Sequence, residues 1–315
     1  MSSCLEWAGM VVSAVRDVVG RCDCITLTGG VDSTFLALVH PARSLLRGVT
    51  VDLGGSDALY AMMVSQQLLI GVHEIIKPSE VDVWEALDWV LGNLKTIDPV
   101  EVSADIVHYM TARWALERGC RCLLTGDGGD EVFLGYTFLE NMSLEELREW
   151  HEWVIREARL PTVQVGSILG VKVVTPLYLP EVREISRVVP VDCMLRRGLG
   201  GKILLRSYLE ANGLRDIAWR PKTPVNIGSG SLKMLKELAS KTYVDEEEVA
   251  GSLGFKPPTR LHAFLALRML KLKIEIPERV EEGCPICGRK LNGRTCFFCG
   301  SYIARDGVIL HYTGD

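Results

Sequence analysis

The fold is decided by Ile25-Thr26-Leu27-Thr28-Gly29-Gly30-Val31-Asp32-Ser33-Thr34. The apolar run from Ile25 to Leu27 predicts a buried parallel strand, and the apolar run 35–39 predicts a helix. A strand, a glycine turn and a helix form a phosphate-binding geometry. Glycines let the backbone approach an anion, and the free amides of the first helical turn point at it. We therefore predict that this loop binds the phosphates of a nucleotide.

The aspartate inside this loop needs a cation between itself and a bound phosphate. Asp32 alone would repel the anion, whereas Mg²⁺ favours one or two carboxylates together with phosphate oxygens. The hydroxyls of Thr28, Ser33 and Thr34 add polar groups. The loop fits neither G-x-x-x-x-G-K-[ST] nor G-x-G-x-x-G, so an ordinary turn between strand and helix is the alternative interpretation.

Strands and helices alternate along the chain as far as residue 125. Further strands are expected at 48–53, 72–76 and 122–125, and helices at 5–19, 58–69, 80–93 and 102–118. Ser56 or Asp57 is expected to cap the helix 58–69. This order predicts an α/β fold, a doubly wound parallel sheet with helices on both faces. Ligands of such sheets bind beyond the carboxyl ends of the strands, where the loops after residues 27 and 124 fall.

The second of these loops, Gly126-Asp127-Gly128-Gly129-Asp130-Glu131-Val132-Phe133-Leu134-Gly135-Tyr136, is acidic and rich in glycine. Three carboxylates within five positions beside a phosphate loop predict a cation site, here Mg²⁺ on the phosphates. A solvated acidic turn is the alternative, but it does not explain the interleaved glycines.

Both loops resemble known family motifs. The first resembles the S-G-G-x-D-S loop of the PP-loop (HUP-like) ATP pyrophosphatases, with Thr28 in place of the first serine. The second resembles the asparagine synthetase motif S-G-E-G-x-D-E-x-F-x-G-Y. Segments 173–179, 201–206 and 217–224 resemble further motifs of that family in the same order. The resemblance extends from about residue 20 to about residue 235 and implies the fold of that family.

The resemblance also implies a reaction. It points to an ATP-dependent amide-forming ligase that activates a carboxylate as an acyl-adenylate, releases pyrophosphate and admits ammonia or another amine. Asp32 and Asp130 would hold Mg²⁺, and Lys202, Lys222, Asp130 and Glu131 would be catalytic. An ordinary surface lysine is the alternative for each lysine. The groups implied to bind ATP are Leu27, Thr28, Gly29, Gly30, Asp32, Ser33, Val51, Thr125, Gly126 and Asp127.

Three departures from the family bear on the substrates. The glutaminase domain is not found ahead of the first loop, so we expect free ammonia or a separate amidotransferase chain to supply nitrogen. Asp127 stands where the family has glutamate, and Leu179 where it has the aspartate of P-F-L-D. Both lie in the region expected to touch the acceptor acid, so aspartate is one candidate among small carboxylic acids.

Two C-x-x-C-G knuckles near the C-terminus predict a metal site. Cys284, Cys287, Cys296 and Cys299 fit a closed tetrahedral Zn²⁺ site with a structural role, and disulfides are the alternative. We expect an asparagine-synthetase-like ATP pyrophosphatase domain at 1–276 and a zinc ribbon at 277–315.

The other six cysteines form two Cys-x-Cys pairs and two single residues. Cys22/Cys24 and Cys120/Cys122 begin strands that are neighbours in the usual doubly wound order, while Cys4 and Cys193 stand alone. Buried thiols are one interpretation of the pairs. Cross-strand disulfides are the other, since they occur in intracellular proteins of hyperthermophiles.

Composition limits the remaining function classes. The net charge of −5 over 315 residues argues against broad nucleic-acid binding. No apolar run approaches a membrane span and no secretion signal is visible, so a cytoplasmic protein is expected. Two alternatives stay open. One is an RNA-modifying PP-loop enzyme that grips nucleic acid with the ribbon and the basic helix 260–273, and the other is a nucleotide-binding regulator without turnover.

Overall fold

The computed structural model describes residues 2–304 and 307–313, and the chain divides into two compact units. The first unit comprises the residues up to 77 together with 110–229, and the second comprises 78–109 and the residues from 230 onward. This division does not fall at residues 276 and 277, because the expected ribbon shares its unit with helices from two parts of the chain. The separate domains at 1–276 and 277–315 stay a prediction.

The first unit is built on a five-stranded parallel sheet, as the sequence predicts. The strand order is β3 (Val72–Ile76), β2 (Arg47–Val51), β1 (Cys24–Thr26), β4 (Leu123–Leu124) and β5 (Val173–Val174). The middle strand β1 pairs in parallel with both β2 and β4. The chain returns to the sheet on both sides of β1, so the fold is doubly wound.

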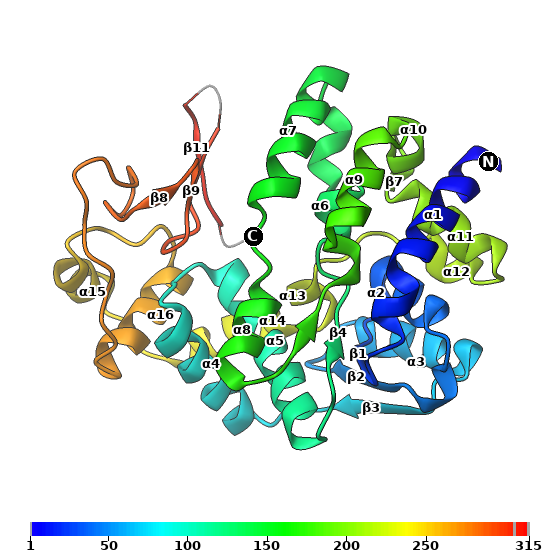
Figure 1. Ribbon diagram of the computed structural model, residues 1–315. Helices are drawn as coiled ribbons and strands as arrows, with labels where there is room; N and C mark the ends of the chain where they lie inside the picture. The colour runs from blue at the N-terminus through cyan, green and yellow to red at the C-terminus, as the bar shows by residue number, and fades with distance from the viewer. Residues whose placement is uncertain (1, 305–306, 314–315) are drawn as a thin grey trace. The chain divides into compact units, whose positions relative to one another are not determined.

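Buried side chains cover both faces of this sheet. Ile25 and Leu124 belong to the larger apolar cluster, which includes α1 (Ser2–Val19) and α2 (Val31–Val39). Cys24 and Leu123 belong to the smaller cluster on the opposite face, because successive strand residues point to opposite sides. The two N-terminal helices are blue in Figure 1.

Further helices and turns complete the first unit. The helices are α3 (Asp57–Leu68), α6 (Gly129–Val132), α7 (Leu144–Glu157), α8 (Pro161–Leu169), α9 (Pro180–Val188), α10 (Val191–Met194), α11 (Ile203–Ala211), α12 (Arg215–Ala218) and α13 (Val225–Gly228). Three 3₁₀ turns and one two-stranded ribbon are η1 (Arg43–Leu45), η2 (Thr137–Asn141), η3 (Pro176–Tyr178), β6 (Leu195–Arg196) and β7 (Gly200–Gly201).

Two local expectations need correction. The strand β5 was not predicted as a strand, because only two residues of its apolar segment pair with β4. Ser56 is the N-cap residue of α3, as one of the two predictions has it, but its side chain makes no capping hydrogen bond, and Asp57 is the first residue of the helix. Both side chains are engaged by an arginine from elsewhere in the chain, described below.

Six cysteines of the first unit lie in three disulfides. Cys22 is bonded to Cys122 and Cys24 to Cys120, with Cα–Cα distances of 4.9 Å and 6.0 Å. The alternative of free buried thiols is therefore wrong for these pairs. Cys4 and Cys193 do not stand alone, because they form the third disulfide between α1 and α10. The bond between Cys22 and Cys122 spans 100 residues of chain, for which the chain-entropy model gives about 4.7 kcal/mol.

The disulfides predict a thiol count. The unreduced protein, denatured with a chelator present, is expected to take up four alkylating groups per chain, because only the four C-terminal cysteines are free. After reduction all 10 cysteines should react. Intact-mass measurement gives both counts, and uptake of all ten groups before reduction would contradict the disulfides.

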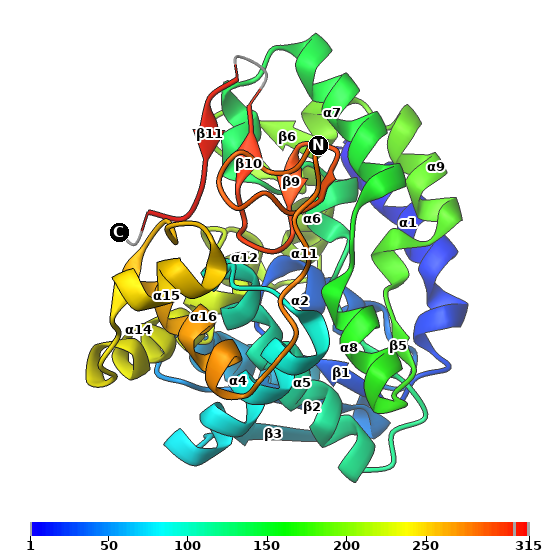
Figure 2. The ribbon, with the colours of Figure 1, turned by 90° about the vertical axis from the view of Figure 1, so that its left-hand side faces the viewer.

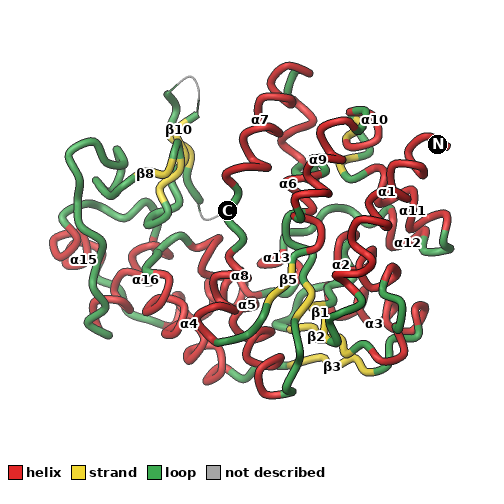
Figure 3. The backbone as a smooth tube through the Cα atoms, in the orientation of Figure 1, coloured by secondary structure: helices red, strands yellow, loops and turns green. Residues whose placement is uncertain are grey.

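The second unit combines helices with a cysteine-rich ribbon. Helix α16 (Arg260–Lys271) packs against α4 (Glu80–Leu94), α14 (Ser231–Lys241) and α15 (Glu246–Leu253), which Figure 2 shows gathered together. Helix α5 (Pro99–Glu117) contributes its residues through 109 to this unit. The ribbon is mostly loop (Figure 3) and carries four short antiparallel strands. These are β8 (Leu291–Asn292), β9 (Thr295–Cys296), β10 (Tyr302–Ile303) and β11 (Ile309–Leu310).

A search of the described helices for membrane spans gives a negative result. None of them has both the length and the apolar character that crossing a bilayer requires.

Candidate active site

Hydroxyl groups of the glycine loop between β1 and α2 make hydrogen bonds within the loop. The Oγ1 of Thr28 and the Oγ of Ser33 lie 3.1 Å apart, and the amide of Gly30 donates to Thr28 Oγ1 at 3.2 Å. The side chains of the loop therefore shape its turn, which lies where the phosphate-binding geometry of a strand, a glycine loop and a helix N-terminus is expected.

Two carboxylates and two ammonium groups converge beside this loop. Lys202 forms a short hydrogen bond to Asp32, and its Nζ lies 2.8 Å from Asp130 Oδ1. The Nζ of Lys222 donates to the other oxygen of Asp130 at 2.6 Å. The four residues come from α2, from α6, from the turn before α11 and from the segment before α13. Residues up to 190 positions apart in sequence thus form one charge-balanced cluster.

Two glycines of the acidic loop are required by this close approach. A Cβ on Gly129 would lie 2.3 Å from Asp32 Oδ1, and a Cβ on Gly135 would lie 2.1 Å from Asp130 Oδ1. Any larger residue at either position would displace a carboxylate. The interleaved glycines therefore make room for the acidic side chains of both loops.

The two aspartates differ in their electrostatic surroundings. Burial raises the pKa of both, but Lys202 and Lys222 outweigh it at Asp130 and lower its pKa to about 2. At Asp32 burial prevails, the charge of Asp130 adds to it, and the pKa is raised. Burial lowers the pKa of Lys202, but the two carboxylates outweigh it and raise that pKa. Asp130 is therefore the firmly ionised member, and a cation would favour ionisation of Asp32.

The cluster fits the Mg²⁺ ion that the sequence predicts. Asp32 Oδ1 is a buried oxygen without a hydrogen-bond donor among the described residues, whereas Asp130 Oδ1 faces the Nζ of Lys202 at 2.8 Å. An acceptor left in that state is costly unless an ion or a bound ligand meets it. Carboxylate oxygens are the protein ligands that Mg²⁺ prefers.

The other residues predicted for the site lie in or beside the two loops, but not all of them face the lysines. Glu131 does not face the lysines, because its carboxylate accepts a hydrogen bond from the hydroxyl of Tyr136. Thr125 donates from Oγ1 to Asp127 at 3.1 Å, beside the acidic loop. The remaining predicted ATP contacts, Leu27, Gly29, Gly30, Ser33, Val51 and Gly126, lie in or next to β1, β2 and the two loops.

Arg220, which lies in the motif-like segment 217–224 but was not predicted as a site residue, connects these parts. Arg220 donates to Thr28 O at 3.0 Å and to Ser56 Oγ at 3.1 Å. It also forms an ion pair of 2.6 Å with Asp57, and its guanidinium lies 3.9 Å from the centre of the Tyr60 ring. Both charged side chains are almost fully buried. This arginine therefore fixes the glycine loop to the start of α3.

In the sequence, the one indication of a role for Arg220 is its position two residues before Lys222. Arg206 adds support, because its guanidinium donates to the carbonyl of Arg220 at 2.9 Å and to that of Ala218 at 2.6 Å. Burial raises the pKa of Asp57, even though the charge and the hydrogen bond of Arg220 act to lower it.

The four C-terminal cysteines form a separate site in the second unit. Their sulfur atoms all lie within 4.8 Å of one another and all four side chains are buried. Cys284 Sγ lies 3.7 Å from Cys299 Sγ, and Cys287 Sγ lies 3.5 Å from Cys296 Sγ. A disulfide requires about 2.05 Å, whereas a tetrahedron with Zn–S bonds of about 2.3 Å has sulfurs about 3.8 Å apart. The donors and their spacing fit tetrahedral zinc.

Neighbouring groups hold the two knuckles in place. His262 of α16 has its Nε2 3.2 Å from the carbonyl of Cys299. Arg289 donates to the carbonyls of Cys287 and Leu253, so it joins a knuckle to the end of α15. Such second contacts orient the ligands of a metal site.

A glycine loop after β1 and an acidic glycine loop after β4, joined by paired lysines, give this chain the α/β architecture of a PP-loop protein. The family model described as asparagine synthase matches residues 22–185, just over half of the chain. The chain belongs to the asparagine synthase family.

Curated relatives extend the similarity beyond that range. The chain is 26% identical over 284 residues to the glutamine-hydrolysing asparagine synthetase B of Escherichia coli (strain K12), a match that covers 82% of this chain and 51% of that protein. It is 25% identical to the glutamine-hydrolysing asparagine synthetase of Gallus gallus, covering 76% and 46%. It is 24% identical to a putative glutamine-hydrolysing asparagine synthetase of Methanocaldococcus jannaschii, covering 69% and 47%. The chain spans about half the length of these curated relatives.

One solved structure is similar over part of the chain. The NMN synthetase from Francisella tularensis is 14% identical, with a TM-score of 0.31, and the match covers 60% of this chain and 97% of that one.

Proposed function

We propose that the protein is an ATP-dependent carbon–nitrogen ligase that forms AMP. In this reaction a carboxylate oxygen attacks the α-phosphorus of ATP, the bond to the β-phosphate breaks, and pyrophosphate leaves. Ammonia or another amine then attacks the acyl carbon of the adenylate, loses a proton, and displaces AMP. The curated relatives carry the name asparagine synthetase, so aspartate is the first acid to test.

One observation carries the proposal: the pairing of Asp32 and Asp130 with Lys202 and Lys222 across the two loops. Asp32 has one buried oxygen, Oδ1, without a hydrogen-bond donor among the described residues, and both oxygens of Asp130 face a lysine. An acyl-adenylate forms only if negative charge on the leaving pyrophosphate is stabilised. Paired cations in a site closed to water provide that stabilisation.

The chain's own groups divide this work. Lys202 is 3% exposed in its side chain and bound to both aspartates, so it fixes their positions. Lys222 is 24% exposed, so its ammonium group is the one that can reach substrate phosphates. Asp32 and Asp130 would hold Mg²⁺, which when bound neutralises phosphate charge.

The RNA-modifying alternative receives no support from the basic helix α16. Arg268 is bound to Asp88 by two hydrogen bonds of 2.6 Å, and Arg260 lies 3.9 Å from Glu246. Guanidinium groups paired in this way do not form the open basic stripe that a nucleic-acid backbone requires. The net charge of −5 points the same way.

The proposal predicts the nucleotide products. The full chain with ATP, Mg²⁺, ammonia and a panel of small carboxylic acids that includes aspartate is expected to yield AMP and pyrophosphate in equal amounts. Only an accepted acid should support this, because the carboxylate is the nucleophile. Phosphorus NMR or anion-exchange chromatography of the products measures it.

Two controls sharpen the result. The amide of each acid lacks the attacking oxygen and should give only background cleavage. If ADP and phosphate are the only products with every acid, the class of reaction is wrong. If AMP forms without an amide product, the chain activates the acid but uses a different nucleophile.

A further inference from the structure

The guanidinium of Arg220 is buried where three segments of the first unit meet. Its side chain is 5% exposed, and that of its ion-pair partner Asp57 is 4% exposed. One terminal nitrogen donates to the carbonyl of Thr28, and the other donates to Ser56 Oγ and to Asp57. The ring of Tyr60 lies against the guanidinium. A buried charge that loses its partners is costly, so these contacts confine the guanidinium to one position.

The glycine loop is packed against the same end of α3. Gly29 has a φ of +65°, and a Cβ at this position would lie 2.4 Å from the main-chain carbon of Tyr60. Gly29 directly follows Thr28, the residue whose carbonyl Arg220 holds. Two successive residues of the loop are therefore fixed, one by the arginine and one by the first turn of α3.

The segment that carries Lys222 is attached at both ends to the chain just before α3 and at its start. At one end stands Arg220, with the contacts described above. At the other end the carbonyl of Ser229 accepts hydrogen bonds from the amides of Leu53, at 2.8 Å, and Gly55, at 3.2 Å. The backbone of the lysine therefore has little freedom to shift between these two attachments.

Only Pro221 separates the arginine from the lysine. A proline ring fixes its own φ and restricts the backbone of the residue before it. The Cα atoms of Arg220 and Lys222 are therefore at most about 7 Å apart, across a stiff link. The ammonium group of Lys222 lies 2.6 Å from Asp130. The arginine thus sets where the lysine side chain begins, and Asp130 holds the other end of that side chain.

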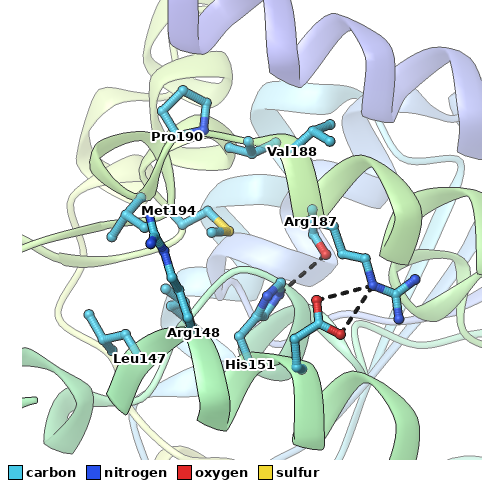
Figure 4. Close-up of a pocket in the computed structure, with 12 residues that line it drawn as sticks. Leu147, Arg148, His151, Arg187, Val188, Pro190 and Met194 are labelled. Atoms are coloured by element: carbon cyan, nitrogen blue, oxygen red, sulfur yellow. Dashed lines mark hydrogen bonds and ion pairs between the residues drawn. The ribbon is translucent and has the colours of Figure 1, made fainter. Parts of the chain in front are cut away.

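Two other arginine–carboxylate pairs of the first unit lack this arrangement. Arg187 lies 3.2 Å from Glu152 beside the cavity that Figure 4 shows, and both side chains are partly exposed. Exposed pairs of this kind contribute little to stability. Arg47 joins Asp23, at 2.8 Å, to the carbonyl of Arg118, at 2.8 Å, but it begins β2 and so lies at the opposite end of the sheet from both loops. It is therefore a matched control.

We propose that Arg220 is a positioning residue, which places the ammonium group of Lys222 against phosphates held by the glycine loop. This role rests on the proposed function, because it requires ATP phosphates between the loop and the lysine. The planar fork of a guanidinium reaches the carbonyl of Thr28 with one nitrogen and Asp57 with the other. A lysine in its place would keep the ion pair with Asp57, but its single ammonium group would not hold the Thr28 carbonyl as well.

The first measurement compares turnover in folded variants. Arg220→Lys should stay folded, because it keeps a positive charge beside Asp57, and near-ultraviolet circular dichroism checks this. Its rate of AMP formation is expected to fall about 10²-fold with a smaller change in the KM for ATP, because a misplacement of about 1 Å costs such a factor. Arg47→Lys should leave both constants unchanged. Wild-type turnover in a folded Arg220→Lys protein would overturn the proposal.

The second measurement shows whether Arg220 acts through Lys222. In a Lys222→Met background, adding Arg220→Lys should lower turnover by no more than about twofold, because the group that the arginine places is already absent. A merely structural role would lower turnover by the same factor in both backgrounds. Equal factors would therefore overturn the proposal.

The third measurement needs no turnover. The full chain is acetylated with and without Mg²⁺ and ATP, and mass spectrometry follows the label on Lys222. With ATP about tenfold above its Kd, labelling of Lys222 should slow about tenfold in the wild type and in Arg47→Lys. In Arg220→Lys at equal occupancy by ATP, it should slow much less. This pattern in a wild type that forms no AMP would contradict the proposed function and support the positioning role. No protection in the wild type, or equal protection in Arg220→Lys, would overturn the positioning role.

Discussion

Replacing Lys222 with methionine is expected to lower the rate of AMP formation by a factor of about 10² to 10³, while the protein stays folded. Its ammonium group is bound to Asp130 at 2.6 Å and is partly exposed, so it can meet phosphate charge as that charge develops. Loss of one such stabilising group from an enzyme site costs about 10²–10³ in turnover. The rate is measured with the acid that the product assay identifies.

The structure explains why this variant should fold. Asp130 keeps Lys202 as a partner at 2.8 Å, so no buried carboxylate is left without a cation. The matched control is Lys233→Met on α14, which removes an exposed lysine paired only loosely with Glu237 at 3.9 Å. Near-ultraviolet circular dichroism checks the fold of both variants. Full activity of a folded Lys222→Met protein would place the catalytic cation elsewhere.

Most of the sheet could be predicted from local sequence. The strand 72–76 was predicted with the observed bounds, and the strand at 25–27 is displaced by one residue. Short apolar runs between glycine turns are a clear pattern for buried parallel strands. β5 was not predicted, because two residues are too few to show the alternating pattern of a strand.

The candidate site could be predicted only in part, for geometric reasons. Asp130 and Glu131 are adjacent in sequence, but adjacent helical residues point about 100° apart. Only Asp130 therefore faces the lysines, and Glu131 turns to Tyr136. The sequence treats both as acidic residues of one motif and cannot tell them apart.

The pairing of Arg220 with Asp57 shows a second limit. These residues are 163 positions apart, and Ser56-Asp57 before an apolar run has the ordinary pattern of a helix cap. Only the fold brings the arginine to this helix start, where it also holds the carbonyl of Thr28. Local patterns give the helix and miss the partner. The disulfides between the two Cys-x-Cys pairs were easier to predict, because parallel neighbouring strands bring their starting ends together.

Replacing Cys284 with serine is expected to release one zinc ion per chain and to unfold the ribbon. The four strands of the ribbon have two residues each, so their ladders alone cannot hold it. Structural zinc contributes about 10–16 kcal/mol of apparent binding free energy in zinc-finger peptides, and that free energy is folding free energy. A hydroxyl in place of one thiolate removes a quarter of the coordination, so much of this stabilisation should be lost.

The zinc prediction is checked by native mass spectrometry and limited proteolysis of the full chain. The wild type should carry one zinc ion, lose it to a strong chelator, become sensitive to protease within 278–304, and recover on addition of zinc. Cys284→Ser should show the sensitive pattern from the outset and not recover. Ser252→Ala changes an exposed residue of α15 in the same unit and should behave as the wild type. A wild-type chain that is free of metal and equally resistant to protease would show that the four cysteines hold the ribbon without zinc.

We do not expect that result, because the sulfur–sulfur distances are 3.7 Å for Cys284 and Cys299 and 3.5 Å for Cys287 and Cys296. These distances leave room for a bridging ion and are too long for a disulfide.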